Sequence, residues 1–442
     1  MSQTKSNFHG TANPAVSDPE DAVLIARRMA ALGPSYRLFY DEPLHPVRAE
    51  GIWITDKDGR RYLDVYNNVP SVGHCHPRVV DALSKQAAVL NTHTRYLHEN
   101  VVEFSERLLA TMPDSLNRTI FTCTGSEAND LALRIAHFHT GGTGIVVTDL
   151  AYHGGTLAVA EMSPSLGLGV GKNVRTVAPP DTYRTGEGDA AAEFGARVAA
   201  AFDDLRASGI TPSALIFDTI FSSDGVFAPP PGILKSAVEA AHKAGAVFIA
   251  DEVQPGFGRT GECFWGFQNH DLIPDIVTMG KPMGDGHPMA GLALSAELAD
   301  GFGKVSRYFN TFGGNPVSAA VGLAVLNVIR DEALQENARI TGKYLRDGLR
   351  DLASAHKVVG DVRGAGLFIG LEMVRDRETK TPATEETAWL VNELRRRGVL
   401  ISRAGPHGNV LKIRPPLPFR PEHADHFTEV MEQTLTALAQ RF

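Results

Sequence analysis

Residues 246–253, AVFIADEV, are the stretch that decides the fold. Its first five residues are apolar and two acids follow, a pattern typical of a parallel strand that is covered on both faces. Similar apolar runs occur at 144–150, 214–220 and 275–280. Residues 230–245 predict a helix between two of these strands, because prolines precede it, a glycine ends it and its apolar side chains share one face: Ile233, Leu234, Ala237, Val238 and Ala241. This order predicts an α/β fold with a mostly parallel sheet.

The two ends of the chain have a different pattern. Residues 47–68 predict a β-meander, whereas the tail predicts helices at about 335–355 and 384–397 and a last helix after Pro421. Residues 1–21 lack a secretory apolar core and are typical of a flexible arm. Both ends therefore indicate an α+β arrangement.

The length of 442 residues allows about two or three domains. We expect residues 76–330 to form a large α/β domain. Residues 1–75 are expected to form an N-terminal arm and part of a smaller α+β domain, which residues 331–442 complete. The small domain is thus built from both termini.

Composition argues against several classes of function. A formal net charge of −8 provides no basic surface for nucleic acid or membrane, and no apolar run reaches the ~18 residues of a membrane span. The three cysteines, Cys75, Cys123 and Cys263, are far apart, which favours a reducing cytoplasm. In GHCHP, residues 73–77, a strand would turn Cys75 away from both histidines, and no second ligand cluster follows, so we expect no metal site.

Lys281 occupies an unusual place in TMGKPMGDGHP, residues 278–288. A strongly polar side chain stands between Gly280 and Pro282, where a buried strand ends and no helix can begin. Burial lowers the pKa of a lysine, and at a pKa of ~10.4 only about one amine in a thousand is neutral at pH 7.4. A buried lysine is therefore better able to attack a carbonyl. On its own, a strand-end lysine that reaches solvent is the simpler explanation.

Two further segments carry chemistry at the ends of strands. In FTCTGSEANDLALRIAHF, residues 121–138, Gly125 and Ser126 begin a helix whose free N–H groups could bind an anion. In DLAYHGGT, residues 149–156, Tyr152 follows a strand at the edge where α/β sheets bind ligands. An ordinary capped helix and core packing are the alternatives.

In FIADEVQPGFGRTG, residues 248–261, Asp251 and Glu252 follow an apolar run, which is costly unless the carboxylates have partners. Such a carboxylate can keep a ring nitrogen protonated, although a structural salt bridge explains it equally well. Together with the lysine, the helix start and the aromatic residue, these acids indicate one ligand with a phosphate, a flat ring, a basic ring nitrogen and an aldehyde. Pyridoxal 5′-phosphate has all four groups.

Five motifs support this interpretation. GSEAND, AYHG, ADEVQPGFGRTG, TMGKP and TFGGNP occur in the order and spacing of the class III aminotransferases. The chain resembles this family, whose members are fold-type I pyridoxal-phosphate enzymes, over nearly its whole length. The resemblance implies a catalytic pair, with Lys281 bound to the cofactor as a Schiff base and Asp251 paired with the pyridine nitrogen.

The resemblance also implies the residues that would bind the cofactor. Tyr152 and Val253 would enclose the ring, and Gln254 would bond near the ring hydroxyl. The other implied cofactor contacts are His153, the phosphate-binding Gly125 and Ser126, and Thr311 from the neighbouring subunit. The site would then exist only in a homodimer, and two dimers could pair as a tetramer.

Within the family, residues 67–80 and 90–100 and the KPMGDGHP segment are most similar to the branch of ethanolamine-phosphate and 5-phosphohydroxylysine phospho-lyases. The family motif Glu-Pro-(Ile/Val)-Gln is replaced by DTIFSSDG, residues 218–225. Ser223 therefore stands where a glutamate masks the substrate-binding arginine in ω-amino-acid transaminases. The neighbouring Asp224 could substitute after a small loop shift.

Arg414, in LKIRPPL, matches the family's arginine that binds a substrate carboxylate, although the eukaryotic phospho-lyases carry lysine there. Arginine binds both carboxylate and phosphate in a bidentate way. Arg95 and Asp218 are further candidate substrate contacts, and Arg95 could equally be a surface residue.

The expected function is elimination of phosphate from a small phosphorylated amine such as O-phosphoethanolamine, which releases an aldehyde, ammonia and phosphate. The alternative is transamination between an ω-amine or amino acid and pyruvate or 2-oxoglutarate. A non-catalytic protein that binds pyridoxal phosphate is the third hypothesis.

Overall fold

The computed structural model describes residues 18–442, apart from the side chains of Glu187 and Asp189. Most of the predicted arm, residues 1–17, lies outside this range. Its last residues begin helix α1 (Pro19–Leu32), which the sequence analysis missed although Asp18 caps it by accepting a hydrogen bond from the N–H of Glu20. None of the described helices is long and apolar enough to cross a membrane.

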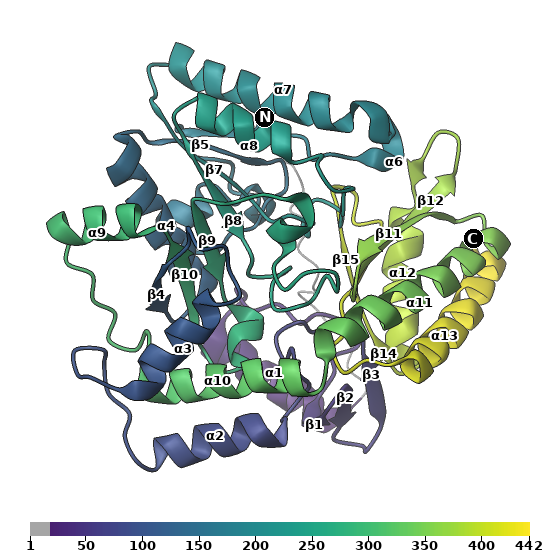
Figure 1. Cartoon of the computed structure of the whole chain (residues 1–442). Coiled ribbons are helices and arrows are strands. Elements are labelled where there is room, and N and C mark those ends of the chain that lie inside the picture. The colour runs from purple at the N-terminus through teal and green to yellow at the C-terminus, as the bar shows by residue number, and fades with distance from the viewer. Residues whose placement is uncertain (1–17) are drawn as a thin grey trace.

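A seven-stranded sheet forms the centre of the described chain (Figure 1). Its order is β4 (Arg118–Thr122), β10 (Ala290–Leu294), β9 (Ile276–Met279), β8 (Val247–Asp251), β7 (Pro212–Phe217), β5 (Gly144–Thr148) and β6 (Val174–Val177). Strand β10 is antiparallel to both of its neighbours, whereas the strands from β9 to β6 are mutually parallel. The four strands predicted from apolar runs are all present in this sheet.

The parallel strands are buried on both faces, as their continuous apolar runs predict. On one face Ile216 and Ile249 pack with helices α4 (Gly125–Thr140) and α9 (Ala296–Val305). On the other face Leu215 and Phe248 pack in a second core with α7 (Glu187–Ala207) and α8 (Lys235–Lys243). The remaining helices of this part of the chain are α2 (Pro77–Ala87), α3 (Glu99–Leu109) and α10 (Pro316–Asp331).

Two smaller sheets join the ends of the chain. One contains β1 (Pro46–Glu50), β2 (Trp53–Asp56), β3 (Arg61–Asp64) and β14 (Val399–Leu400), and the other contains β11 (Val359–Ala365), β12 (Phe368–Asp376), β16 (Val410–Ile413) and β15 (Ser402–Ala404), with β13 (Thr381–Pro382) paired to β12. The pairing of β3 with β14 supports a small domain built from both termini. The boundaries at 75/76 and 330/331 stay a prediction.

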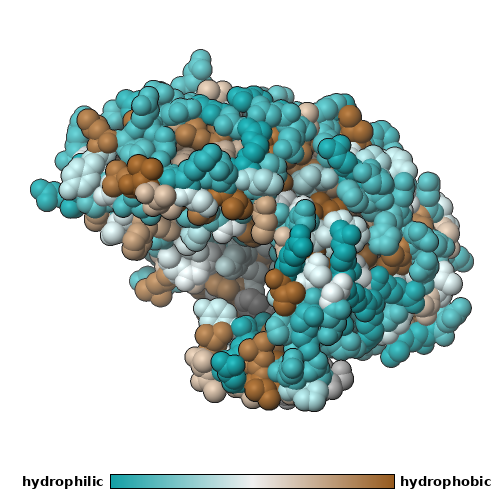
Figure 2. All heavy atoms as spheres, turned by 90° about the horizontal axis from the view of Figure 1, so that it is seen from below, coloured by the Kyte–Doolittle hydropathy of each residue, from teal (hydrophilic) through white to brown (hydrophobic). Residues whose placement is uncertain are grey.

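Helices α11 (Leu334–Ala355), α12 (Thr384–Arg396) and α13 (Pro421–Arg441) lie beside these sheets (Figure 1) and agree with the predicted ranges. Two predicted elements are shorter than expected. Helix α8 begins at Lys235, so Ile233 and Leu234 precede it, and β7 ends at Phe217 because the carboxylate of Asp218 accepts backbone hydrogen bonds in the following turn. On one face of the molecule the surface is deeply hollowed near its centre (Figure 2).

The histidines of GHCHP contact different carboxylates. Nε2 of His74 lies 2.7 Å from Asp64, Nε2 of His76 lies 3.0 Å from Glu332, and Cys75 is exposed. Among residues 18–442 the structure contains no group of three or more His, Cys, Asp or Glu side chains placed to hold a metal.

Candidate active site

A cavity of about 280 Å³ is lined by residues that follow five strands of the central sheet. Strands β4, β5, β7, β8 and β9 all contribute at their carboxyl ends, where open α/β sheets bind ligands. The lining includes most of the predicted site residues: Gly125, Ser126, Tyr152, His153, Asp218, Asp251, Val253, Gln254 and Lys281. Residues 123–281 are thus brought to one place by the topology of the sheet.

Lys281 follows β9 directly and begins a short 3-10 helix (Lys281–Gly284). Its φ of +25° is rare for a residue with a side chain, which indicates that the surrounding structure imposes this conformation. Burial lowers the pKa of Lys281, and the positive charge of Arg414 lowers it further, whereas Asp251 and Asp218 act in the opposite direction. The result is an amine that loses its proton more readily than a lysine in water.

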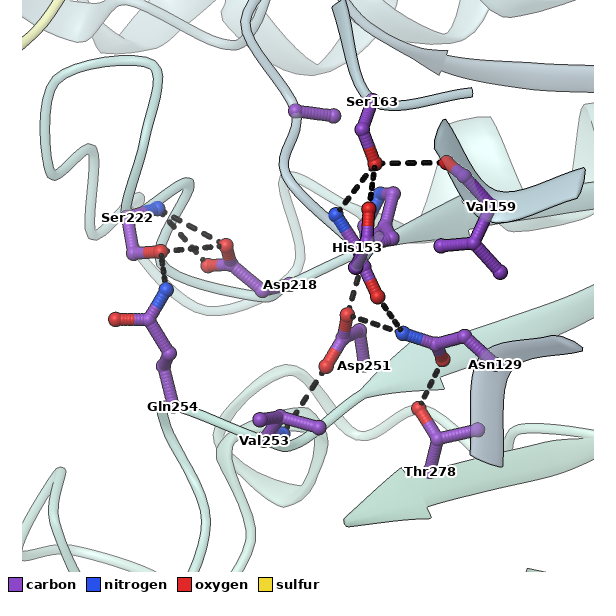
Figure 3. Close-up of polar contacts among 12 residues, drawn as sticks. Asn129, His153, Val159, Ser163, Asp218, Ser222, Asp251, Val253, Gln254 and Thr278 are labelled. Atoms are coloured by element: carbon purple, nitrogen blue, oxygen red, sulfur yellow. Dashed lines mark hydrogen bonds and ion pairs between the residues drawn. The ribbon is translucent and has the colours of Figure 1, made fainter. Parts of the chain in front are cut away.

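Asp251 ends β8 and is held by donors from three directions (Figure 3). Its Oδ2 lies 2.7 Å from Nδ1 of His153 and accepts a hydrogen bond of 3.0 Å from Nδ2 of Asn129, while Oδ1 accepts one of 3.1 Å from the N–H of Val253. The Oγ1 of Thr278 donates to Oδ1 of Asn129 at 2.6 Å and so fixes the orientation of that amide. These contacts hold the carboxylate in one orientation at the cavity wall.

The N-terminus of α4 forms another part of the wall. Thr124 and Glu127 make a capping box, and within the described chain the N–H groups of Gly125 and Ser126 donate to no protein acceptor. A side chain at Gly125 would come within 3.1 Å of Val253, and one at Gly154 within 2.4 Å of Ser126. The two glycines therefore let Val253 and Ser126 approach closely, and the free N–H groups at the start of α4, which line the cavity, suit a phosphate.

A chain of hydrogen bonds leads from Asp218 to Arg414, in part visible in Figure 3. Oγ of Ser222 donates to Asp218 at 2.9 Å and accepts from Nε2 of Gln254 at 2.7 Å. Oε1 of Gln254 accepts from Nη1 of Arg414 at 2.7 Å, and the same Nη1 donates to Oδ1 of Asn68 at 3.0 Å. Arg414 therefore lies directly behind a residue of the cavity wall, although it does not line the cavity itself.

Asp224 does not mask Arg414. Its carboxylate accepts hydrogen bonds from Oγ1 of Thr148 at 2.7 Å and from the N–H of Leu150 at 2.9 Å. The loop that carries it has positive φ at Phe221 and Val226, which is unfavourable for such side chains and shows that the loop is held in place by its contacts. The substitution by Asp224 that the sequence left open is therefore absent from this structure.

Replacing Asp224 by asparagine is expected to change the pH dependence of stability. Burial raises the pKa of Asp224 to about 7. Because the folded state keeps this proton more firmly, its contribution to the free energy of unfolding is present below about pH 4 and is lost as the pH rises to about 7. Urea unfolding at several pH values should show the wild type losing at most about 4 kcal/mol relative to Asp224→Asn across this window. Parallel stability curves would contradict the assignment.

Glu252, the second acid of the predicted pair, has a structural role. Its two oxygens accept hydrogen bonds of 2.8 Å from the N–H groups of Gly266 and Phe267, and burial raises its pKa to about 8. The residue anchors the segment after β8 and does not line the cavity.

Besides Arg414, two predicted residues lie outside the cavity of their own chain. Thr311 is exposed, and the exposed guanidinium of Arg95 lies 3.8 Å from the ring centroid of Phe309. The segments that carry them expose several large apolar side chains: Tyr96, Leu97, Val305, Phe309 and Phe312. Thr311 was predicted to serve a neighbouring subunit, whereas the predicted substrate contact of Arg95 is not made within one chain.

Four polar residues of the site were not singled out from the sequence. They are Asn68, Asn129, Ser222 and Thr278. A signal existed for Asn129, a polar residue on the buried face of the predicted helix at 121–138. Asn68 and Thr278 form their contacts across long stretches of chain, and Ser222 bonds both the nearby Asp218 and the distant Gln254, so local patterns contain no sign of them.

Comparisons with known proteins agree with this geometry. The model of the family Aminotransferase class-III matches residues 39–435. The chain is 40% identical over 433 residues to alanine–glyoxylate aminotransferase 2 homolog 2, mitochondrial, of Arabidopsis thaliana, covering 96% of this chain and 90% of that protein. It is 36% identical over 458 residues to ethanolamine-phosphate phospho-lyase homolog 1 of Caenorhabditis elegans, covering 98% of each.

Among solved structures, a phospholyase from Arthrobacter in complex with phosphoethanolamine is similar to this chain over its full length. The two are 46% identical, with a TM-score of 0.90, and the match covers 93% of this chain and 99% of the other. The predicted fold class is thereby confirmed.

Proposed function

The chain belongs to the class III aminotransferase family, and on that premise we propose that it eliminates phosphate from a small phosphorylated amine such as O-phosphoethanolamine. Membership makes it a pyridoxal-phosphate-dependent enzyme, a transaminase or a lyase. The choice of the lyase reaction is the proposal, and it is supported by the substrate-side arginine and by the similarity to the Arthrobacter phospholyase.

The observation that carries the proposal is the environment of Arg414. Its guanidinium donates to the amide oxygens of Asn68 and Gln254 and forms no salt bridge within residues 18–442. Ser223 and Asp224 leave it uncovered, because Ser223 has no charge and Asp224 is bound to Thr148. An arginine without a salt-bridge partner suits a substrate that always bears an anion, as a phosphorylated amine does.

The residues present fit pyridoxal phosphate. We propose that the free N–H groups at Gly125 and Ser126 hold its phosphate, that Tyr152 and Val253 lie on either side of its ring, and that Asp251 faces the ring nitrogen. Lys281 would attach it covalently. These roles are supported by the positions of the residues in the cavity lining, by the close approach that the glycines allow at Val253 and Ser126, and by the fixed orientation of the Asp251 carboxylate.

His153 and Gln254 would act at the edge of the ring. The amide of Gln254 already donates to Ser222 and accepts from Arg414, so one N–H remains to reach the ring hydroxyl. Nε2 of His153 is buried without a partner among the described residues. Nδ1 of His153 orients the carboxylate of Asp251.

When bound, the cofactor withdraws electrons from the substrate carbon that bears nitrogen and makes its hydrogen acidic. Nζ of Lys281, with its lowered pKa, is the group that takes this proton. Arg414 would bind the substrate's phosphate group. When the bond between the substrate carbon and the phosphate oxygen breaks, the guanidinium would stabilise the phosphate anion that leaves. Asp218, which lines the cavity near Lys281, would face the amine end of the substrate.

A two-channel assay tests this function. Purified enzyme is incubated with O-phosphoethanolamine, and inorganic phosphate and keto-acid consumption are measured in parallel. We expect phosphate release without any keto acid, and an Arg414→Ala variant should raise KM about 10- to 100-fold, because a hydrogen-bonded ion pair is lost. No phosphate above background would refute the proposed reaction.

Transamination is the second candidate, and the 40% identity to a protein named alanine–glyoxylate aminotransferase supports it. Arg414 would then bind a carboxylate in place of a phosphate. With an amino-acid donor present, the enzyme should consume pyruvate, glyoxylate or 2-oxoglutarate. With the donor alone, the cofactor absorbance should shift from about 415 nm to about 330 nm. If no donor produces that shift, this candidate fails.

We propose a homodimer in which each cavity is completed by Thr311 of the other subunit. Support comes from the exposed apolar side chains around Thr311 and from its position outside its own cavity. Mixing inactive Lys281→Ala and Thr311→Glu chains should restore about a quarter of wild-type activity, since half of the dimers contain one intact site of two. Recovery of no activity would contradict the shared site, and a Thr311→Glu chain that is active on its own would place Thr311 outside both cavities. Whether dimers pair further, and whether the cytoplasm is the compartment, stay predictions, since a relative is named mitochondrial.

A further inference from the structure

Arg414 is positioned by neutral groups only. Nη1 contacts Oδ1 of Asn68 at 3.0 Å and Oε1 of Gln254 at 2.7 Å, and the guanidinium carbon lies 4.9 Å from the ring centroid of Tyr66. Nε is buried without a partner within the described chain. An amide oxygen orients a guanidinium by one hydrogen bond but leaves its positive charge uncancelled.

Three acids of the surrounding segments, Asp64, Asp218 and Asp224, each accept hydrogen bonds from other donors, and none forms a salt bridge with Arg414 within residues 18–442. Asp64 accepts from the N–H groups of Tyr66 and Asn67 and lies 2.7 Å from Nε2 of His74. The carboxylate of Asp218 accepts hydrogen bonds from both the N–H group and the hydroxyl of Ser222. Asp224 is bound by Thr148 and Leu150. None of the three carboxylates is therefore available to cover the guanidinium in this structure.

Among the side chains that contact the guanidinium of Arg414, Asn68 is the least exposed. Its relative exposure is 2%, and its Nδ2 is buried without a hydrogen-bond partner in the part of the chain that is described. An unpaired buried N–H group is unfavourable, so a carboxylate of the same shape would suit Arg414 better in the absence of substrate. Val69, the next residue after Asn68, lines the cavity. Asn68 and Arg414 therefore lie beside the cavity in which the substrate would bind.

We propose that Asn68 is a positioning residue that determines substrate class: its neutral amide keeps Arg414 oriented and charged, so the site requires an amine that carries a phosphate or another strong anion. This inference rests on the proposed function insofar as Arg414 is the substrate's anion receptor. A carboxylate at position 68 would mask Arg414 internally and remove the requirement.

Two substitutions separate charge from shape. Asn68→Asp keeps the shape and adds a negative charge, whereas Asn68→Ala removes the hydrogen bond and adds no charge. Titration of inorganic phosphate into the holoenzyme, whose own cofactor phosphate fills the cradle, should show affinity reduced about 100-fold in Asn68→Asp and less than about 10-fold in Asn68→Ala. KM for O-phosphoethanolamine should rise in the same order, while kcat changes less.

A purely structural role for Asn68 predicts the reverse order, with Asn68→Ala the weaker binder and Asn68→Asp close to wild type. That order, or wild-type holoenzyme that binds no phosphate, would overturn the inference. Asn173→Asp provides the control, because it adds the same charge beside Thr143, at the amino end of β5, whereas the cavity residues follow the carboxyl ends of the strands. Phosphate binding and phosphate release are measured separately, so a wild type that binds phosphate but fails to release it from O-phosphoethanolamine would refute only the proposed reaction.

Discussion

Replacement of Lys281 by alanine is expected to lower turnover by at least about 10⁴-fold while the fold is kept. The residue has two roles, covalent attachment of the cofactor and removal of the substrate proton, and acid–base catalysis alone is worth about 10²- to 10⁴-fold. The side chain ends in a cavity, so its truncation leaves the central sheet intact. Turnover of O-phosphoethanolamine and the absorbance of the attached cofactor are the two measurements.

Covalent attachment is tested directly by borohydride reduction and peptide mapping. In wild type the labelled peptide should contain Lys281, and the Lys281→Ala protein should carry no label. Lys304→Ala, at an exposed position on α9, provides the control and should behave as wild type. Label on a different lysine, or turnover retained without Lys281, would contradict the assignment of this residue.

The strands that carry the site could be predicted because each is buried on both faces and is therefore continuously apolar. The runs at 144–150, 214–220, 246–253 and 275–280 correspond to β5, β7, β8 and β9, with ends displaced by at most three residues. The order of these runs also predicts that their carboxyl ends meet at one edge. The local sequence patterns were therefore sufficient to predict that Lys281 and Asp251 lie close together.

Contacts across the sheet could not be predicted in the same way. Asn129 reaches Asp251 over 122 positions of sequence, and Asn68 reaches Arg414 over 346. Neither contact leaves a periodic signal. The orientation of Asp224 depends on a loop with positive φ at two bulky residues, which no turn rule anticipates. Helix α1, by contrast, was missed although Asp18 and Pro19 are standard start signals.

Replacement of Asp251 by asparagine is expected to reduce kcat about 10²- to 10³-fold with little change in fold. A preorganised charge opposite the site of electron withdrawal is typically worth this much. His153 and Asn129 both donate to Oδ2 of Asp251, so the side-chain oxygen of the asparagine must take that position. Its NH2 group would then face the N–H of Val253, which now donates to Oδ1. A neutral amide cannot keep a ring nitrogen protonated. The measurements are kcat and the thermal unfolding midpoint.

The adjacent acid provides the matched control for this substitution. Glu252 stands next to Asp251 but binds only the N–H groups of Gly266 and Phe267, and its pKa of about 8 keeps it protonated at neutral pH. Glu252→Gln is neutral like the protonated wild-type side chain and keeps one of its two acceptor oxygens, so we expect a small loss of stability and a kcat within about threefold of wild type. If both variants lose activity equally, the effect comes from disturbed structure at the end of β8. If Asp251→Asn keeps wild-type turnover, the ring nitrogen does not depend on this carboxylate.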